Sequence, residues 1–386
     1  MKTLFIISIS VILYAYLAYP ALVYLLSLFY RKRVSGKYLF PTVSVIISAY
    51  NEEKYIRDKI QSLMELDYPD KRIEILIGSD GSTDSTDRII EEAVNSPAHQ
   101  ATSKIRFYRN DRRQGKPSML NRLVPMATGE ILIFTDARQR LDKMAIQELV
   151  KDFGDAKVGS VSSALFYEND DQTGVGLGLY WKYEKFIRLS ESRIGSMLGA
   201  TGALYAIRKE LYPSLPPGLI LDDVYIPLRI IEAGYRAIFE PKAKVFDRIF
   251  KDPKTEFSRK ARTLAGNYQL SLYFKELFNP FKGKIAWQFF SHKFLRLVVP
   301  FLLVILFLSN IFINGFFYQA FFYIQVVFYC FALLGGVFKN RNKVLDVCYM
   351  FCVMNAAAVY GLFRYLTGRQ SVLWEKSHDH PRGEKI

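Results

Sequence analysis

Four short groups of charged residues have the types and the order that chemistry on a phosphorylated substrate needs. They are Ser79-Asp80-Gly81-Ser82, Asp136-Ala137-Arg138, Asp222-Asp223 and Arg259-Lys260-Ala261-Arg262. Each of the first two groups follows an apolar, β-branched stretch, at residues 73–78 and 130–135. Carboxylates at the carboxyl ends of buried parallel strands face the crevice where α/β proteins bind ligands. The pattern therefore predicts a site for a phosphorylated, nucleotide-linked substrate.

Strand and helix patterns alternate around the first two groups. β-Branched runs next to turn residues predict strands, and apolar residues spaced three and four apart predict helices. The expected strands cover residues 41–48, 73–78, 105–108 and 130–135, and the expected helices lie near 56–63, 84–94 and 118–126. Alternation at such short spacing is typical of a doubly wound, mostly parallel sheet. We therefore expect an α/β domain over residues 38–280.

The apolar residues are concentrated at the two ends of the chain. Half of its 386 residues are hydrophobic, which is enough for one such domain and several membrane spans. Residues 3–30 carry no charge, and this run exceeds the ~20 residues that a bilayer helix needs. A signal peptide is the alternative, but its apolar core is usually shorter, and no small-residue cleavage site precedes Arg31. We expect a transmembrane helix over residues 1–30 and three more within 294–366, at about 294–314, 316–338 and 344–366.

The chain is strongly basic, with a formal net charge of +15, and its Lys and Arg residues gather beside the hydrophobic spans. Nucleic-acid binding is one interpretation of such a charge. The positive-inside rule and attraction to anionic lipid explain the same clusters more simply. We therefore expect membrane lipid, and no nucleic acid, as a partner. Arg31-Lys32-Arg33 places residues 38–280 in the cytosol, a count that conflicts with the basic residues of the polar tail at 367–386.

Residues 281–296 mix aromatic and basic side chains at helical spacing. This pattern favours an amphipathic helix that lies in the membrane interface and leads into the second span. A buried helix of the domain is the alternative, and it is disfavoured because Lys284, Lys293 and Arg296 accompany the aromatic residues.

Several motifs together resemble those of family 2 glycosyltransferases, which have the GT-A fold. The motifs are Pro41–Glu53, Ser79–Asp84, Gly115-Lys116-Pro117 with Asn121, Phe134–Arg138, Gly199 with Gly202, Asp222-Asp223 and Arg259–Gln269. The resemblance covers residues 41–270 and the membrane layout, and it is to polysaccharide synthases of the cellulose, hyaluronan and poly-N-acetylglucosamine type. It implies a Rossmann-like, mostly parallel sheet and a nucleotide-sugar donor that carries UDP.

The resemblance assigns Ala49, Glu52 and Asp80 to the pocket for the nucleobase and ribose. It assigns Lys116 to the base or the phosphate. Each charged residue of this set has a simpler alternative. Glu52 could be a helix-start charge that the helix dipole favours, Asp80 could form a turn with the glycine after it, and Lys116 could be a solvated loop residue.

The resemblance also implies a divalent metal, Mg²⁺ or Mn²⁺, bound to the diphosphate through an Asp-x-Asp motif. Hard oxygen ligands suit these ions. Asp136 is the first aspartate of the motif, but Arg138 replaces the last one. A direct contact between Arg138 and phosphate would suit the arginine fork. A salt bridge from Arg138 to a neighbouring carboxylate is the alternative.

Asp222-Asp223 matches the position of the family's catalytic base. Transfer with inversion needs a base for the acceptor hydroxyl, so we expect Asp223 to be that base, supported by Asp222. A helix cap is the alternative. The arginine of the family's Gln-x-x-Arg-Trp motif falls on Arg262, whereas Arg259 and Thr263 replace its other residues. We expect both arginines at the diphosphate.

Two residues are expected on the acceptor side, Gly202 from its motif and Trp181 as an aromatic that stacks on the acceptor sugar. Core packing is the alternative for Trp181. The missing aromatic at Thr263 weakens the case for a processive synthase.

These expectations describe an inverting glycosyltransferase in a bacterial or archaeal plasma membrane. It would pass a sugar from a nucleotide sugar to a lipid-linked sugar or a growing polysaccharide. A polyprenyl-phosphate glycosyltransferase is the alternative enzyme. A membrane transporter with a regulatory nucleotide-binding domain is the alternative from another class, although spans with almost no charge argue against an ion pathway.

Overall fold

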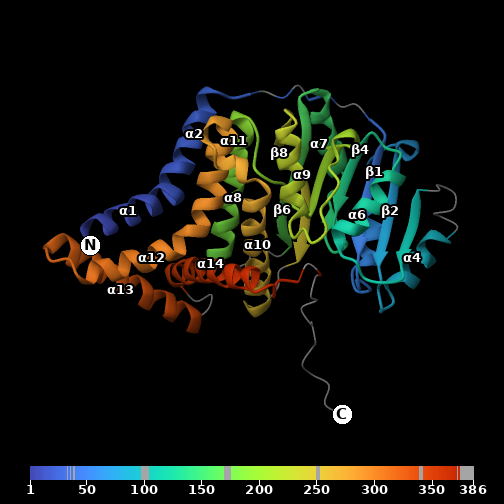
Figure 1. The fold of residues 1–386 in the computed structure, drawn as a ribbon. Coiled ribbons are helices and arrows are strands. Elements are labelled where there is room, and N and C mark those ends of the chain that lie inside the picture. Colours follow the sequence, from blue (N-terminus) through green and yellow to red (C-terminus); the bar gives the residue numbers. More distant parts are fainter. Residues whose placement is uncertain are drawn as a thin grey trace, which may run out of the picture.

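The computed structural model describes residues 1–32, 34, 36–37, 40–96, 104–168, 175–248, 253–338, 342–371 and 373. These residues hold an eight-stranded sheet with the strand order β3-β2-β1-β4-β7-β6-β8-β5. Helices cover both faces of the sheet, and a group of long helices lies beside it (Figure 1). Residues 374–386 of the expected polar tail lie outside the described residues.

The first half of the sheet is parallel and follows the predicted strands. It consists of β1 (Val43–Ala49), β2 (Ile73–Asp80), β3 (Ile105–Asn110) and β4 (Ile131–Thr135). β1 lies between β2 and β4, so that Ile46 has Leu76 on one side and Phe134 on the other. The carboxyl ends of these strands meet at one edge, which brings the segments after Ala49, Asp80 and Thr135 together.

The second half of the sheet mixes directions. It consists of β7 (Leu204–Arg208), β6 (Val158–Glu168), β8 (Arg236–Arg248) and β5 (Arg140–Leu141). β7 is antiparallel to both β4 and β6, whereas β8 is parallel to β6 and antiparallel to β5. The sequence pattern predicted a mostly parallel sheet of α/β type, which is confirmed, but it did not predict these four strands.

Side chains of β1 alternate between two hydrophobic cores, as the two-residue period of a strand requires. The helices of the two cores are α3 (Ile56–Met64), α4 (Thr86–Val94), α7 (Ala145–Val150), α6 (Lys116–Leu123), α9 (Asp222–Glu232) and α10 (Pro253–Tyr273). Val45 and Ile47 pack with α3, α4 and α7. Ile46 packs on the other face with α6, α9 and α10. The sheet is thus a buried platform from whose edge the site residues project.

Four helices are long and apolar enough to cross a membrane: Lys2–Phe29, Lys284–Ile311, Phe316–Val337 and Lys343–Leu366. They match the expected spans and indicate a membrane protein. The first contains α1 (Lys2–Leu13) and α2 (Tyr19–Phe29), joined by a π-helical turn, and Figure 1 shows a bend between them. A 28-residue helix is about 42 Å long, more than the ~30 Å of a bilayer core. Part of this helix is therefore available to pack on the domain.

The predicted interface helix is the beginning of the second long helix. That helix runs without a break through α11 (Lys284–Gln288), a π-helical stretch (Phe289–Phe294) and α12 (Leu295–Ile311). Its residues Ser291 and His292 are buried, so one face of this segment packs inside the protein, in partial agreement with the alternative of a domain helix. A position at the membrane interface stays a prediction.

The last two long helices are α13 (Phe316–Val337) and α14 (Lys343–Leu366). α14 packs against α8 (Val175–Ile194) and α10, and Figure 1 shows it crossing α10. A Cβ atom on Gly361 of α14 would lie 2.7 Å from the Ala261 carbonyl oxygen of α10. Only glycine permits this close approach, which places a candidate membrane helix directly against the α/β domain.

Candidate active site

One cavity of about 1110 Å³ lies between the strand edge, α8, α9, α10 and α14. At its first end it is lined by Glu52, Lys116, Asp136, Arg138 and Asp222. We call this end the donor end, after the donor site that the sequence predicts there. Asp223, Gly202, Trp181, Arg259 and Arg262 also line the cavity. The cavity therefore brings together ten of the twelve residues that the sequence singled out.

Ala49 and Asp80, the other two, do not line the cavity. Asp80 is buried, and its carboxylate accepts hydrogen bonds from the backbone N–H groups of Gln114 and Gly115 at 2.9 and 2.6 Å. The Asn110 amide donates a third bond to it at 3.0 Å. Asp80 thus fixes the loop before α6, which carries Lys116. A role for Ala49 and Asp80 at the nucleobase stays a prediction.

Lys116 is the cationic centre of the donor end. It is the first residue of α6, after Gly115, whose φ of 94° favours glycine. Its Nζ lies 2.9 Å from Asp136 Oδ1 and 3.2 Å from Asp222 Oδ2. Burial disfavours the ammonium, but the Asp136 and Asp222 carboxylates outweigh burial and raise the pKa of Lys116. This lysine is therefore a permanent charge and no solvated loop residue.

Asp222 and Asp223 begin α9 and bind different groups. Asp222 faces Lys116, whereas Asp223 Oδ2 accepts a 2.9 Å hydrogen bond from the Gly202 N–H. A Cβ atom on Gly202 would lie only 3.2 Å from Asp223 Oδ2, which explains the glycine. Burial, together with the adjacent Asp222 charge, raises the pKa of Asp223 to about 6. The raised pKa brings Asp223 closer to neutral pH, which suits the general base that the sequence predicts here.

Arg138 forms the salt bridge that was the alternative to phosphate contact. Its Nε and Nη2 donate to the two carboxylate oxygens of Asp247 on β8, at 2.9 and 2.7 Å. The Asp247 side chain is only 2% exposed. The arginine fork therefore joins the end of β4 to β8. Contact of Arg138 with the diphosphate stays a prediction, since Arg138 also lines the cavity.

Lys59 is a buried residue of the site that the sequence analysis missed. Its Nζ donates to Thr135 Oγ1 at 2.7 Å and to the Gln139 carbonyl oxygen at 2.9 Å. Burial lowers its pKa to about 7, and the nearby Asp136 charge opposes that shift. Lys59 thereby fixes both ends of the segment that carries Asp136. A signal existed, because Lys59 occupies the apolar stripe of its helix between Ile56 and Ile60.

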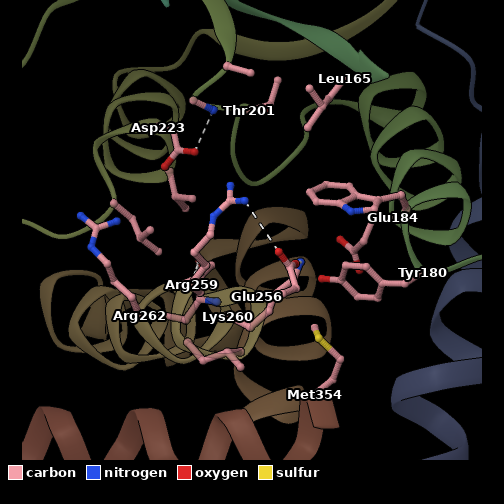
Figure 2. A pocket seen from close by; sticks show the side chains of 18 of the residues that line it. Leu165, Tyr180, Glu184, Thr201, Asp223, Glu256, Arg259, Lys260, Arg262 and Met354 are labelled. Atoms are coloured by element: carbon pink, nitrogen blue, oxygen red, sulfur yellow. Dashed lines mark hydrogen bonds and ion pairs between the residues drawn. The ribbon is translucent and has the colours of Figure 1, made fainter. Parts of the chain in front are cut away.

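The arginines of α10 form the wall opposite Asp223. Figure 2 shows Arg259 extending from α10 into the cavity. It lies 3.7 Å from Glu256, and Arg262 Nη2 donates to the Ile220 carbonyl oxygen at 3.3 Å. Trp181 of α8 faces the same space, with Lys260 Nζ 4.6 Å from the centre of its ring. Trp181 is therefore a wall residue and no core residue, while stacking on an acceptor stays a prediction.

The second end of the cavity, which we call the membrane end, is formed by residues of the long helices. They are Tyr16, His292, Lys293, Arg296, Leu297, Val347, Met350, Phe351, Met354 and Asn355. Figure 2 shows Met354 pointing from α14 toward Arg259 and Tyr180. The same cavity thus holds the carboxylates of Asp222 and Asp223 and apolar side chains of candidate membrane spans. The sequence analysis placed no wall of the site on these helices.

Comparison with known families agrees with this geometry. The family model described as "Glycosyl transferase family group 2" matches residues 131–339, more than half of the chain. The chain belongs to glycosyl transferase family group 2. A second model, "Glycosyl transferase family 2", matches residues 44–214. The predicted family is confirmed, and with it the class of glycosyltransferase.

Proteins from several bacteria are similar to the chain. The probable glycosyltransferase YdaM of Bacillus subtilis is 26% identical over 63% of this chain and 59% of its own length. The poly-beta-1,6-N-acetyl-D-glucosamine synthase of Staphylococcus epidermidis is 25% identical over 52% and 48%. The beta-monoglucosyldiacylglycerol synthase of Nostoc is 31% identical over 34% and 27%. The match thus spans between about a quarter and three-fifths of these relatives.

A solved family-like structure has the same fold along almost the whole chain. It is the mannosyltransferase PcManGT from Pyrobaculum calidifontis in complex with GDP-Man and Mn²⁺. It superposes with a TM-score of 0.72 at 22% identity, covering 95% of this chain and 99% of that one. The predicted GT-A fold is therefore confirmed, and the long helices described above remain candidate membrane spans.

Proposed function

We propose that this chain transfers a sugar, with inversion, from a nucleotide-sugar donor to an acceptor held at the membrane, and that Asp223 is the general base. The observation that carries the proposal is the position of Asp223 in one cavity, between the donor end and the membrane end. The poly-N-acetylglucosamine and glucosyldiacylglycerol synthases among the relatives support a polysaccharide or glycolipid acceptor.

Three cationic side chains support a diphosphate site. Lys116, Arg259 and Arg262 line the cavity beside Asp223. Departure of the nucleotide increases the negative charge on its diphosphate, and fixed cations stabilise that charge in the transition state. The paired carboxylates keep Lys116 protonated, so its charge is available at any physiological pH.

The donor end can hold a divalent metal only with few protein ligands. The described residues contain no cluster of three or more His, Cys, Asp or Glu side chains that could hold a metal ion. Mg²⁺ is commonly held by one or two carboxylates and the phosphates of the substrate. We propose Asp136 as the protein ligand for Mg²⁺ or Mn²⁺, in keeping with the Mn²⁺ of the solved mannosyltransferase. Such an ion would neutralise charge on the diphosphate.

The chemical step follows from the placement of Asp223. The acceptor hydroxyl oxygen attacks the anomeric carbon, the bond from that carbon to the diphosphate breaks, and the hydroxyl proton passes to the Asp223 carboxylate. The Gly202 N–H orients that carboxylate, and Asp222 binds Lys116. We further propose that the domain faces the cytosol of a plasma membrane, where nucleotide sugars are available.

The test uses the purified full chain with a panel of nucleotide sugars, and it measures released nucleotide and transferred sugar. Asp223→Asn should lower turnover by about 10²–10⁴-fold, the usual contribution of a general base. Nucleotide affinity should stay close to that of the wild type. Asp67→Asn is the matched control, because Asp67 is an exposed carboxylate away from the cavity. Turnover above about a tenth of wild type in Asp223→Asn would reject Asp223 as the base.

A further inference from the structure

The membrane end combines apolar walls with positive charge. Leu297, Val347, Met350 and Phe351 supply apolar surface from α12 and α14. Arg188 of α8 and Lys293 of the second long helix line the same cavity and are only half-buried. A surface of this kind suits a ligand with an apolar chain and an anionic group near its polar end.

Arg188 and Lys293 differ from Lys116, Arg138 and Arg296 in their partners. Lys116 pairs with Asp136, Arg138 with Asp247 and Arg296 with Glu184. Within the part of the chain that the structure describes, no hydrogen bond or ion pair joins the side chain of Arg188 or Lys293 to another residue. Glu184, Glu191 and Asp223 act on these two cations without an ion-pair contact. Each partly buried cation has therefore lost hydration without an acid in contact, which is costly.

The nearby carboxylates are already used by other groups. Glu184 binds Arg296, and its second oxygen lies 3.4 Å from His292 Nε2. Glu191 accepts from the Tyr19 hydroxyl at 2.5 Å and lies 2.8 Å from His292 Nδ1. These bonds join α8 to the first two long helices. Glu184 and Glu191 are therefore engaged at the junction of these helices. An anion that contacts Arg188 and Lys293 would have to come from a ligand.

We propose that the membrane end is a binding site for the phosphate of a lipid, and that the acceptor is a sugar joined to its lipid through phosphate or diphosphate. The phosphate would bind Arg188 and Lys293, the lipid chain would follow the apolar wall of α14, and the sugar hydroxyl would face Asp223. This inference rests on the proposed function and names its acceptor class. A neutral glyceride would leave both cations unpaired, and a polysaccharide chain would have no use for an apolar wall.

The need for a base distinguishes two possible acceptors that carry a lipid phosphate. A lipid monophosphate that itself attacks the anomeric carbon does so with an ionised oxygen and needs no base. A sugar hydroxyl must lose its proton, which Asp223 would accept. The placement of Asp223 in the cavity therefore favours a lipid-linked sugar as the acceptor and a plain lipid phosphate as a ligand that binds without reacting.

The test compares farnesyl phosphate with farnesol, which differ only in the phosphate, as ligands of the full chain in phosphatidylcholine nanodiscs. Native mass spectrometry gives the two affinities, and UDP affinity is measured on the same samples. We expect farnesyl phosphate to bind at least about tenfold more tightly, the scale of one charged hydrogen bond. Arg188→Gln and Lys293→Gln should each reduce this preference by about tenfold, while Arg188→Lys should keep most of it.

Lys182→Gln is the matched control, because Lys182 is an exposed cation of α8 outside the cavity. It should leave the preference unchanged, and unchanged UDP affinity should show that every variant is folded. Equal binding of farnesyl phosphate and farnesol, with UDP still bound, would overturn this inference and leave the proposed function intact. An equal loss of the farnesyl phosphate preference in Lys182→Gln would show that the effect comes from net charge alone, and this would also overturn the inference.

Two further arms identify the source of the phosphate. Sugar transfer is measured with polyprenyl diphospho-N-acetylglucosamine and with polyprenyl phosphate as acceptors. Transfer to the lipid-linked sugar that falls in Arg188→Gln supports the proposal. Transfer to polyprenyl phosphate alone would overturn the assignment of a sugar acceptor. Loss of the farnesyl phosphate preference when phosphatidylglycerol replaces part of the phosphatidylcholine would show that a bulk phospholipid fills the site, which also contradicts the proposal.

Discussion

The two ends of the cavity are built in different ways. The donor end is formed largely by segments that follow the parallel strands β1 to β4. Its charges are paired, Lys116 with two carboxylates and Arg138 with Asp247. The membrane end is assembled from helices distant in the chain, α8, α10, α12 and α14. It includes Arg188 and Lys293, whose side chains form no ion pair with a carboxylate among the described residues. In the proposed function, a preorganised donor site thus meets an acceptor site that its ligand completes.

This difference predicts separate effects of substitutions at the two ends. Changes at the donor end should act on folding or on nucleotide affinity, because its charges bind each other or the diphosphate. Changes at the membrane end should leave the nucleotide bound and act on transfer alone.

The largest effect is expected for Arg138→Ala. It leaves the Asp247 carboxylate, 2% exposed, without its fork. Removing one partner of a buried ion pair costs about 3–5 kcal/mol of unfolding free energy. Denaturant unfolding of the full chain measures this loss, and the double variant Arg138→Met, Asp247→Leu should recover part of it. An unchanged stability with a large loss of UDP affinity would instead make Arg138 a phosphate ligand.

A smaller effect is expected for Arg262→Ala. If its guanidinium faces the diphosphate, UDP affinity should fall by about 1.5–3 kcal/mol, the scale of a charged hydrogen bond. Isothermal titration calorimetry measures the affinity. Lys275→Ala, an exposed cation just after α10, is the control and should bind UDP normally. Equal affinity in the two variants would remove Arg262 from the donor end.

The pH dependence of kcat/KM reports on the residue between the two ends. Burial, with the Asp222 charge, raises the pKa of Asp223 to about 6. A base acts only when ionised, so kcat/KM should rise with pH up to about 6 and then level, falling about tenfold per pH unit below that point. Asp222→Asn removes a neighbouring negative charge and should move this limb to lower pH. If the acidic limb of the kcat/KM profile stays at the same pH in Asp222→Asn, a group other than Asp223 causes it.

The donor end was largely predictable from the sequence, and the membrane end was not. Strand periodicity is local, so the segments that carry Lys116 and Asp136 could be placed at one sheet edge. The Arg138–Asp247 pair joins residues 109 positions apart, and the Glu184–Arg296 pair joins residues 112 apart. Such pairings depend on how helices and strands pack in three dimensions. Periodicity showed that α14 is apolar, but it could not show that Met354 faces the catalytic cavity.

The central claim is that donor and acceptor meet in one cavity that reaches the long helices. Its most direct test is the steady-state kinetics of Met354→Trp, which fills the membrane end with a larger side chain (Figure 2). Val359→Trp, on an exposed position of the same helix, is the control. We expect kcat/KM for the membrane acceptor to fall at least about tenfold, a barrier change of about 1.4 kcal/mol, with KM for the nucleotide sugar unchanged. Normal transfer in Met354→Trp, or an equal loss in Val359→Trp, would contradict the account.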